Sequence, residues 1–230
     1  MYTYLLINVL TVLIPVLLSF ERRVRYVSKW KYALAASFLS ALVFLPWDYY
    51  FVARGVWGFN GAYLTGVYLA NIPLEEVLFF FTVPFSCIFI YEVVGLFTRE
   101  DIFAEISPPF IFTLIICCGL VAFSNMTRLY TASVLLGLAG LLIIHLVLLR
   151  VKYLGRFFIA LTISLIPMVV VNGLLTNGVA FVDSSAVVWY NNAENLALRV
   201  QGIPVEDFAY WFFLFLMNIT WYEYLKRLSR

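Results

Sequence analysis

Seven stretches of this chain are long and apolar enough to form membrane-spanning helices, and this pattern constrains the fold more than any other feature. A hydrocarbon core about 30 Å thick needs ~20 apolar residues per helix. The stretches cover residues 2–20, 31–50, 73–94, 108–125, 131–149, 156–178 and 204–225. The chain is 64% hydrophobic and only 12% charged, whereas soluble domains carry about 25% charged residues. The sequence therefore predicts an all-α integral membrane protein with seven transmembrane helices.

The distribution of basic residues predicts the orientation of these helices. Of the 15 Lys and Arg residues, only Arg54, Arg128 and Arg199 fall on one side of the predicted membrane. The other side carries Arg22, Arg23, Arg25, Lys29, Lys31, Arg99, Arg150, Lys152, Arg156, Lys226, Arg227 and Arg230. Because cytoplasmic loops are enriched in Lys and Arg, we expect an outer N-terminus and a cytoplasmic C-terminus. The net charge of +2 gives no indication of a nucleic-acid partner.

An acidic motif occurs twice, and each copy opens one of the apolar stretches. Ile72-Pro73-Leu74-Glu75-Glu76 reappears 131 residues later as Ile203-Pro204-Val205-Glu206-Asp207. The similarity continues along both stretches, where Tyr91-Glu92 corresponds to Tyr222-Glu223. Carboxyl groups beside hydrocarbon are costly, so a repeated pair of them indicates a chemical role.

The repeated motif also predicts the architecture. We expect a three-helix repeat over residues 1–106, a connector helix over 107–128 and a second three-helix repeat over 129–230. The loops before the motifs match weakly, with Trp57–Asn60 corresponding to Val188–Asn191. One connecting span between two three-span units gives both units the same direction, so they are parallel repeats about an axis along the membrane normal. Both acidic motifs then lie on the non-cytoplasmic side.

The position of the acids at helix starts suits chemistry as well as capping. Proline is favoured in the first helical turn, and the helix dipole stabilises negative charge there. Simple interfacial capping is the alternative, but adjacent residues project about 100° apart, so two acids on each helix cannot all face water. A desolvated carboxyl group that keeps its proton can act as a general acid, and an ionised neighbour can act as a base. The candidate catalytic residues are Glu75, Glu76, Glu206 and Asp207.

Aromatic and polar residues at the same predicted depth complete the candidate site. Aromatic faces attract cations, which suits carbocation chemistry, although core packing and an interfacial aromatic belt are alternatives for each residue. The candidate substrate-binding residues are Phe79, Phe80, Tyr210, Trp211, Trp47 and Trp189. The candidate supporting residues are Asp48, Asn172, Asn191 and Arg199. Turn chemistry is the alternative role for the asparagines, and Arg199 could pair with Glu206, leaving Asp207 as the proton donor.

Other residues receive structural interpretations. We expect Glu92 and Glu223, near the cytoplasmic boundary, to pair with Arg99 or with Lys226 and Arg227. We interpret His145, in the fifth apolar stretch, as a buried packing residue. No Cys/His pattern suggests zinc, and no glycine-rich fingerprint suggests a flavin or nicotinamide. We therefore expect no metal and no cofactor.

The two acidic motifs resemble those of a known family. At Pro73-Leu74-Glu75-Glu76 and Pro204-Val205-Glu206-Asp207 the chain resembles the heterodimeric (c/d-type) lycopene cyclases of bacteria, in which two small three-helix subunits each carry one PxE(E/D) motif. Here the two subunits are fused. The chain is also similar to the cyclase half of the fungal bifunctional lycopene cyclase/phytoene synthase. The resemblance covers essentially the whole chain.

This resemblance implies an activity. It implies conversion of lycopene through γ-carotene to β-carotene by proton-initiated, non-redox cyclisation, which is the work of an intramolecular lyase or isomerase in carotenoid biosynthesis. The implied partners are lycopene and membrane lipid in the bacterial cytoplasmic membrane, and association with other carotenoid enzymes is compatible with it. Formation of ε or γ rings, or a C50 substrate, is the alternative within the family.

The residues also leave open a different class of function and the question whether both acid pairs are catalytic. From the residues alone, intramembrane acids on parallel repeats would also suit a proton-coupled transporter. The halves differ where Trp47-Asp48 corresponds to Val171-Asn172. This difference leaves open whether both acid pairs catalyse.

Overall fold

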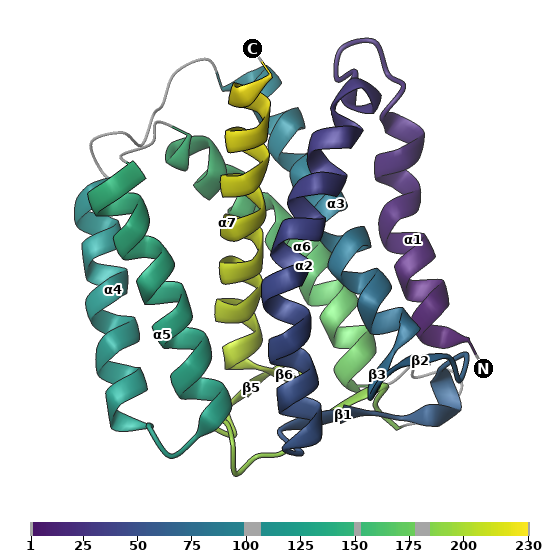
Figure 1. The fold of residues 1–230 in the computed structure, drawn as a ribbon, viewed down its shortest axis with the longest axis vertical. Helices are drawn as coiled ribbons and strands as arrows, with labels where there is room; N and C mark the ends of the chain where they lie inside the picture. The colour runs from purple at the N-terminus through teal and green to yellow at the C-terminus, as the bar shows by residue number, and fades with distance from the viewer. Residues whose placement is uncertain (1, 99–106, 150–152, 178–184, 230) are drawn as a thin grey trace.

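The computed structural model describes residues 2–98, 107–149, 153–177 and 185–229, which include seven α-helices in one bundle (Figure 1). The helices are α1 (Thr3–Leu18), α2 (Trp30–Ala53), α3 (Leu74–Phe97), α4 (Ser107–Ser124), α5 (Leu129–Ile144), α6 (Leu154–Asn177) and α7 (Val205–Leu228). Each coincides with one predicted apolar stretch to within a few residues. Four basic residues used to predict orientation, Arg99, Arg150, Lys152 and Arg230, lie outside the described residues.

Four helical segments of the described chain are long and apolar enough to cross a membrane. They are Tyr26–Ala53, Leu74–Phe97, Leu129–Leu149 and Leu154–Asn177. The apolar segments Thr3–Leu18 and Pro108–Ser124 are shorter, and α7 carries charges at both ends. The protein therefore has the helices of a multi-pass membrane protein, while the count of seven spans and the orientation stay predictions.

Both acidic motifs lie at the same end of the bundle, as the sequence predicts. Helices α3 and α7 begin beside the short strands at the lower end of Figure 1, and the two termini lie at opposite ends. Each helix follows a two-stranded hairpin whose tight turn contains a left-handed residue, Ala70 with φ 54° and Gln201 with φ 50°. The hairpins are β2 (Tyr68–Leu69) with β3 (Ile72–Pro73) and β5 (Arg199–Val200) with β6 (Ile203–Pro204). The repeat thus extends to the backbone conformation.

The two weakly matching loop segments pair with one another. Strand β1 (Trp57–Phe59) lies antiparallel to β4 (Val188–Tyr190), with Gly58 opposite Trp189 at the centre. Pairing of equivalent segments is the pattern of an isologous contact about a two-fold axis. A Cβ atom on Gly58 would overlap the Trp189 indole, so a larger residue at this crossing would displace that ring.

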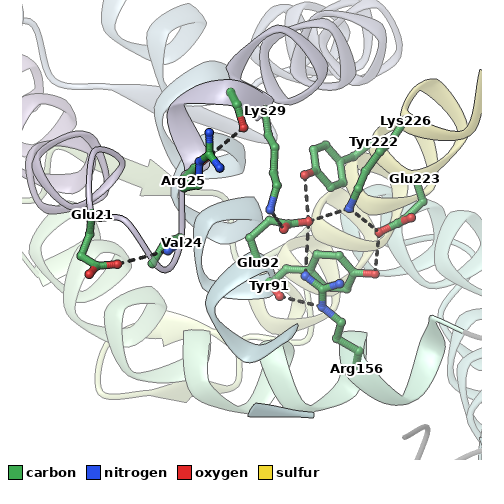
Figure 2. Close-up of polar contacts among 11 residues, drawn as sticks. Glu21, Val24, Arg25, Lys29, Tyr91, Glu92, Arg156, Tyr222, Glu223 and Lys226 are labelled. Carbon is green, nitrogen blue, oxygen red and sulfur yellow. Dashed lines mark hydrogen bonds and ion pairs between the residues drawn. The ribbon is translucent and has the colours of Figure 1, made fainter. Parts of the chain in front are cut away.

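The opposite end of the bundle is held by ion pairs around Glu92 (Figure 2). The Glu92 carboxylate on α3 is almost fully buried and pairs with Lys29, just before α2. Its Oε1 atom lies 3.2 Å from Arg156 Nη2 and 2.9 Å from Lys226 Nζ. The predicted pairing with Lys226 is confirmed for Glu92 and for Glu223. Within the described residues Arg227 forms no ion pair with either glutamate, and Arg99 lies outside them. One carboxylate therefore joins α3 to α6, α7 and the start of α2.

The same end contains a reciprocal pair of hydrogen bonds. The Tyr91 hydroxyl donates to Glu223 Oε1 at 2.9 Å, and the Tyr222 hydroxyl donates to Glu92 Oε1 at 2.8 Å (Figure 2). These residues correspond in the 131-residue repeat, so each half donates to the carboxylate of the other. Helices α3 and α7 are thereby fixed against one another far from the acidic motifs.

Replacing Glu92 with Gln should destabilise the fold. The amide keeps the shape but leaves three partly buried cations without their common anion, which we expect to lower the free energy of unfolding by about 3 kcal/mol. Glu223→Gln is the matched control, because within the described part of the chain this side chain forms one ion pair, at 3.5 Å to Lys226. This change should cost about 1 kcal/mol or less. Equilibrium unfolding in detergent micelles measures both. Equal losses would contradict the central role of Glu92.

Candidate active site

A cavity of about 580 Å³ lies beside the two acidic motifs. Helices α1, α3, α6 and α7 form its walls, with Tyr130 of α5 and residues of β1 and β4 completing the lining. The lining is mostly apolar, yet it includes Glu76 from the first motif and Asp207 from the second. The structure thus brings one acid from each repeat to a single apolar space.

Glu76 meets a hydroxyl group from α1. The Tyr4 side chain, which is buried, donates a hydrogen bond to Glu76 Oε2. The neighbouring turn of α1 is fixed by Asn8, whose Nδ2 atom donates to the Glu75 carbonyl at 3.0 Å. Helix α1 is therefore bonded to the first turn of α3 at the level of this acid.

Asp207 accepts hydrogen bonds from three elements. Its Oδ1 atom accepts from the Tyr130 hydroxyl of α5 at 2.6 Å. Its Oδ2 atom accepts from the Tyr190 hydroxyl of β4 at 2.9 Å and from Asn172 Nδ2 of α6 at 3.3 Å. Burial, and next the negative charge of Asp207, raise the pKa of Tyr190 well above its usual value. This hydroxyl therefore stays protonated and remains a donor.

The first acid of each motif contacts the preceding loop, unlike the second acid, which lines the cavity. Glu75 Oε1 accepts the Thr65 backbone N–H at 2.5 Å, and Glu206 Oε1 accepts the equivalent Leu196 N–H at 2.7 Å. Thr131 Oγ1 also donates to Glu206 at 2.6 Å. Both carboxylates are buried and hold the loops that precede the hairpins. Neither lines the main cavity, and Glu206 borders a separate cavity of about 210 Å³ between α4, α5 and α7.

The predicted substrate-binding residues divide into two groups. Phe79, Tyr210 and Trp211 line the cavity. Trp47 packs behind the wall, with its ring centroid 5.6 Å from that of Tyr210. Phe80 and Trp47 both stack on Phe44 in the buried core, at centroid distances of 6.2 and 5.7 Å. Trp189 lies on β4 with 47% of its surface exposed.

The predicted supporting residues divide in the same way. Asn172 lines the cavity and reaches Asp207. Asp48 is buried outside the lining and accepts a hydrogen bond from Trp57 Nε1 at 2.6 Å, while Trp57 itself faces the cavity.

Two further supporting candidates belong to the outer loops. Asn191 accepts the Ala193 N–H at 3.0 Å in a turn. The Arg199 guanidinium donates to the Gly202 carbonyl at 3.0 Å and to Asn192 Oδ1 at 2.9 Å. Within the described residues its hydrogen bonds therefore go to this loop, whereas Glu206 takes its own from Leu196 and Thr131.

Sequence reasoning missed the three tyrosines that bind the acids. Tyr4 and Tyr130 occupy corresponding places in the first helix of each repeat, but they are 126 residues apart instead of the 131 that relate the motifs. The shift removes them from the alignment that the acids define. Tyr190 lies within the second of the two matching loop segments. Its position follows from the pairing of β4 with β1, which joins the two halves and is not evident from the sequence.

The arrangement can donate and accept a proton in an apolar enclosure. Trp57, Phe59, Val188 and Tyr190 of the β1–β4 pair line the cavity at the end where the acids lie. Aromatic faces beside the acids can stabilise a cation at close range. Among the described residues, no group of three or more His, Cys, Asp or Glu side chains is arranged to hold a metal ion.

Comparison with known proteins gives two matches. A family model described as lycopene cyclase matches residues 1–94 and 127–225, and the interval that it leaves out contains α4. The chain is similar to the bifunctional lycopene cyclase/phytoene synthase of Phaeosphaeria nodorum, with 29% identity over 65 residues. That match covers 28% of this chain and 11% of the fungal protein, so it spans about a tenth of that relative. No solved structure matches the chain.

The first acids of the motifs should be replaceable by an amide but not by alanine. Gln at position 75 or 206 keeps a carbonyl oxygen for the loop N–H group, whereas Ala leaves that buried donor unpaired, at a cost of about 1–3 kcal/mol. We expect Glu75→Ala and Glu206→Ala to open the preceding loops to limited proteolysis and the two Gln variants to resist it. Equal cleavage of the Ala and Gln variants would contradict the anchoring role.

Proposed function

The chain belongs to the lycopene cyclase family, and from this premise we propose that it closes the open ends of lycopene into rings, giving β-carotene through γ-carotene. One observation carries the proposal. Glu76 and Asp207, one from each repeat, line the same apolar cavity. Ring closure of a hydrocarbon without redox change needs a proton donor and a proton acceptor, and this cavity contains one candidate for each role.

We assign the proton donor to Glu76 and the acceptor to Asp207. A carboxylate that accepts several hydrogen bonds is stabilised in its charged form, whereas an apolar environment favours the neutral acid. Asp207 accepts three hydrogen bonds, from Tyr130, Tyr190 and Asn172. Among the residues that the structure describes, Glu76 accepts one, from Tyr4. Hydrogen bonding therefore favours the ionised form of Asp207 more than that of Glu76, which suits a proton acceptor and a proton donor, respectively.

The reaction then proceeds with one proton gained and one lost per ring. Glu76 donates its proton to the terminal double bond, which leaves a tertiary carbocation. A neighbouring double bond attacks this carbon and forms the ring bond, which moves the positive charge into the ring. Asp207 removes a proton from an adjacent carbon and restores a double bond. The product is an isomer of the substrate, and proton exchange resets the two acids.

The cavity lining suits the cationic intermediate. Phe79, Tyr210 and Trp211 present aromatic faces beside the acids, and such faces attract cations. The β1–β4 pair covers the acid end with Trp57 and Tyr190. Excluding water there protects the carbocation from hydration. Which proton Asp207 reaches decides between β, ε and γ rings, so product analysis distinguishes the β-cyclase from the alternatives within the family.

The site is composite, so we propose that the two ends of lycopene react in succession. One cavity contains both acids, and the first acids of the motifs have loop contacts instead of the cavity. γ-Carotene is then an intermediate that leaves and returns with its other end. We also propose seven membrane spans, with the acids near the non-cytoplasmic face, on the basic-residue distribution described above.

Expression in lycopene-accumulating bacteria tests the function. We expect the wild-type chain to convert lycopene to β-carotene. Glu76→Gln and Asp207→Asn should lower conversion by about 100-fold or more, the contribution of a general acid or base. Glu75→Gln and Glu206→Gln are the matched controls and should retain most of the activity. Chromatography of the pigments, normalised to protein in the membrane, gives the result. Unchanged lycopene with wild-type protein present in the membrane would refute the proposal.

Isotope labelling tests the proton-initiated mechanism separately. Membranes containing the wild-type chain are given unlabelled lycopene in D₂O buffer. Because Glu76 exchanges its proton with solvent, each ring should gain one deuteron and the bicyclic product two, which mass spectrometry detects. Cyclic product without deuterium would exclude protonation by a solvent-exchangeable acid.

A further inference from the structure

One side of the cavity is formed by side chains that lie on the outer surface of the bundle. Leu10 and Ile14 on α1 and Ile166 and Val170 on α6 all line the cavity. They are also 55%, 62%, 73% and 57% exposed, respectively. A side chain that both lines a cavity and is exposed marks an opening. The opening lies between α1 and α6, which are neighbours in the bundle.

The other sides of the cavity are closed by buried elements. The β1–β4 pair covers the acid end, where Trp57 and Val188 are buried. Leu214 of α7 and Cys87 of α3, which also line the cavity, belong to the buried core. The exposed lining residues therefore identify the space between α1 and α6 as the route into the cavity.

The surface around this opening is apolar. Beyond the cavity lining, Leu13 and Leu17 on α1 and Ile163 on α6 are exposed as well. Helix α6 is also one of the segments long and apolar enough to cross a membrane. Because exposing such a surface to water is unfavourable, it lies against lipid hydrocarbon. The cavity then opens sideways into the bilayer.

The size of the cavity agrees with such an entrance. A space of about 580 Å³ is of the size that encloses a drug-sized ligand. A carotenoid polyene is a stiff rod that exceeds this space in length, so only one end can lie beside the acids. The remainder must leave through an opening, and hydrocarbon is the environment that it prefers.

Both helices that flank the opening contain a proline in the cavity lining, Pro15 in α1 and Pro167 in α6. Proline removes one backbone hydrogen bond and bends a helix. A proline in each flanking helix is a sequence-encoded reason for the two helices to separate at this level.

We propose that the gap between α1 and α6, lined by Leu10, Ile14, Ile166 and Val170, is a lateral portal for a linear polyene hydrocarbon. One end group enters from the bilayer core through this portal, and the rest of the chain stays in lipid during the reaction. This inference rests on the proposed cyclase function for the identity of the substrate. It adds residues that select for a narrow, linear end.

Bulky substitutions at the portal test the inference. In Ile14→Trp/Ile166→Trp, two indoles narrow the gap without removing any polar contact. We expect lycopene conversion to fall about tenfold or more, as overpacking of a tight passage would cause. The matched control is Leu17→Trp/Ile163→Trp, on the same two exposed helix surfaces but outside the cavity lining, and it should keep the wild-type rate. Ile14→Ala/Ile166→Ala widens the gap and should also convert lycopene.

A second measurement separates binding from turnover. Each pair of substitutions is placed in the Glu76→Gln background, and the lycopene that remains on the purified protein is measured by its absorbance. The portal Trp pair should retain far less lycopene than the control Trp pair. This readout needs no catalysis. If the wild-type chain leaves lycopene uncyclised, the proposed function is refuted, but the retention measurement still tests the portal.

The portal is refuted by any of three results. These are wild-type conversion by Ile14→Trp/Ile166→Trp, an equal loss in the control pair, and equal lycopene retention by both pairs. Absence of bound lycopene from every variant, including Glu76→Gln alone, would refute it as well, because the cavity would then not take a polyene.

Discussion

The fold depends on one constraint, which is that a carboxyl group inside an apolar bundle must find hydrogen-bond donors or cations. Asp207 meets α5, β4 and α6 through its three donors. Glu92 meets three cations at the other end. Each buried acid therefore joins several elements, and the interactions that make its charge tolerable are the same ones that fix the helices. Asp207 thus serves the packing of the helices as well as the proposed chemistry, whereas Glu92 serves the packing alone.

The lengths of the apolar stretches and the repeated motif predict much of this structure. All seven helices and the placement of both motifs at one end follow from them, because a long apolar run has few alternatives to a helix. The division of labour within each acid pair does not follow. Whether Glu75 or Glu76 faces the cavity depends on the rotation of α3, which is set by its packing against α1, α2 and α6 together. The role of Tyr130 depends on a similar contact between α5 and α7.

The two halves agree in backbone and differ in side chains. Their hairpins, turns and loop-holding carboxylates correspond residue by residue. At the cavity the agreement ends, since Asn172 reaches Asp207 while its counterpart Asp48 bonds Trp57 instead. A repeated framework thus supplies a pair of similarly placed acids, and local substitutions make their surroundings unequal. Such inequality favours a fixed division between a protonated and an ionised carboxyl group, because hydrogen-bond donors stabilise the ionised form.

The β1–β4 pairing has a consequence for how the halves come together. Each half contributes one strand, and among the described residues neither strand has a partner within its own half. Two separate polypeptides with these strands would have to find each other by diffusion within the membrane before the cover over the acids could form. Joining them through α4 replaces that encounter with an effective local concentration. The single chain is in this sense a tethered pair of halves, whose cavity and its cover assemble independently of the abundance of the chain in the membrane.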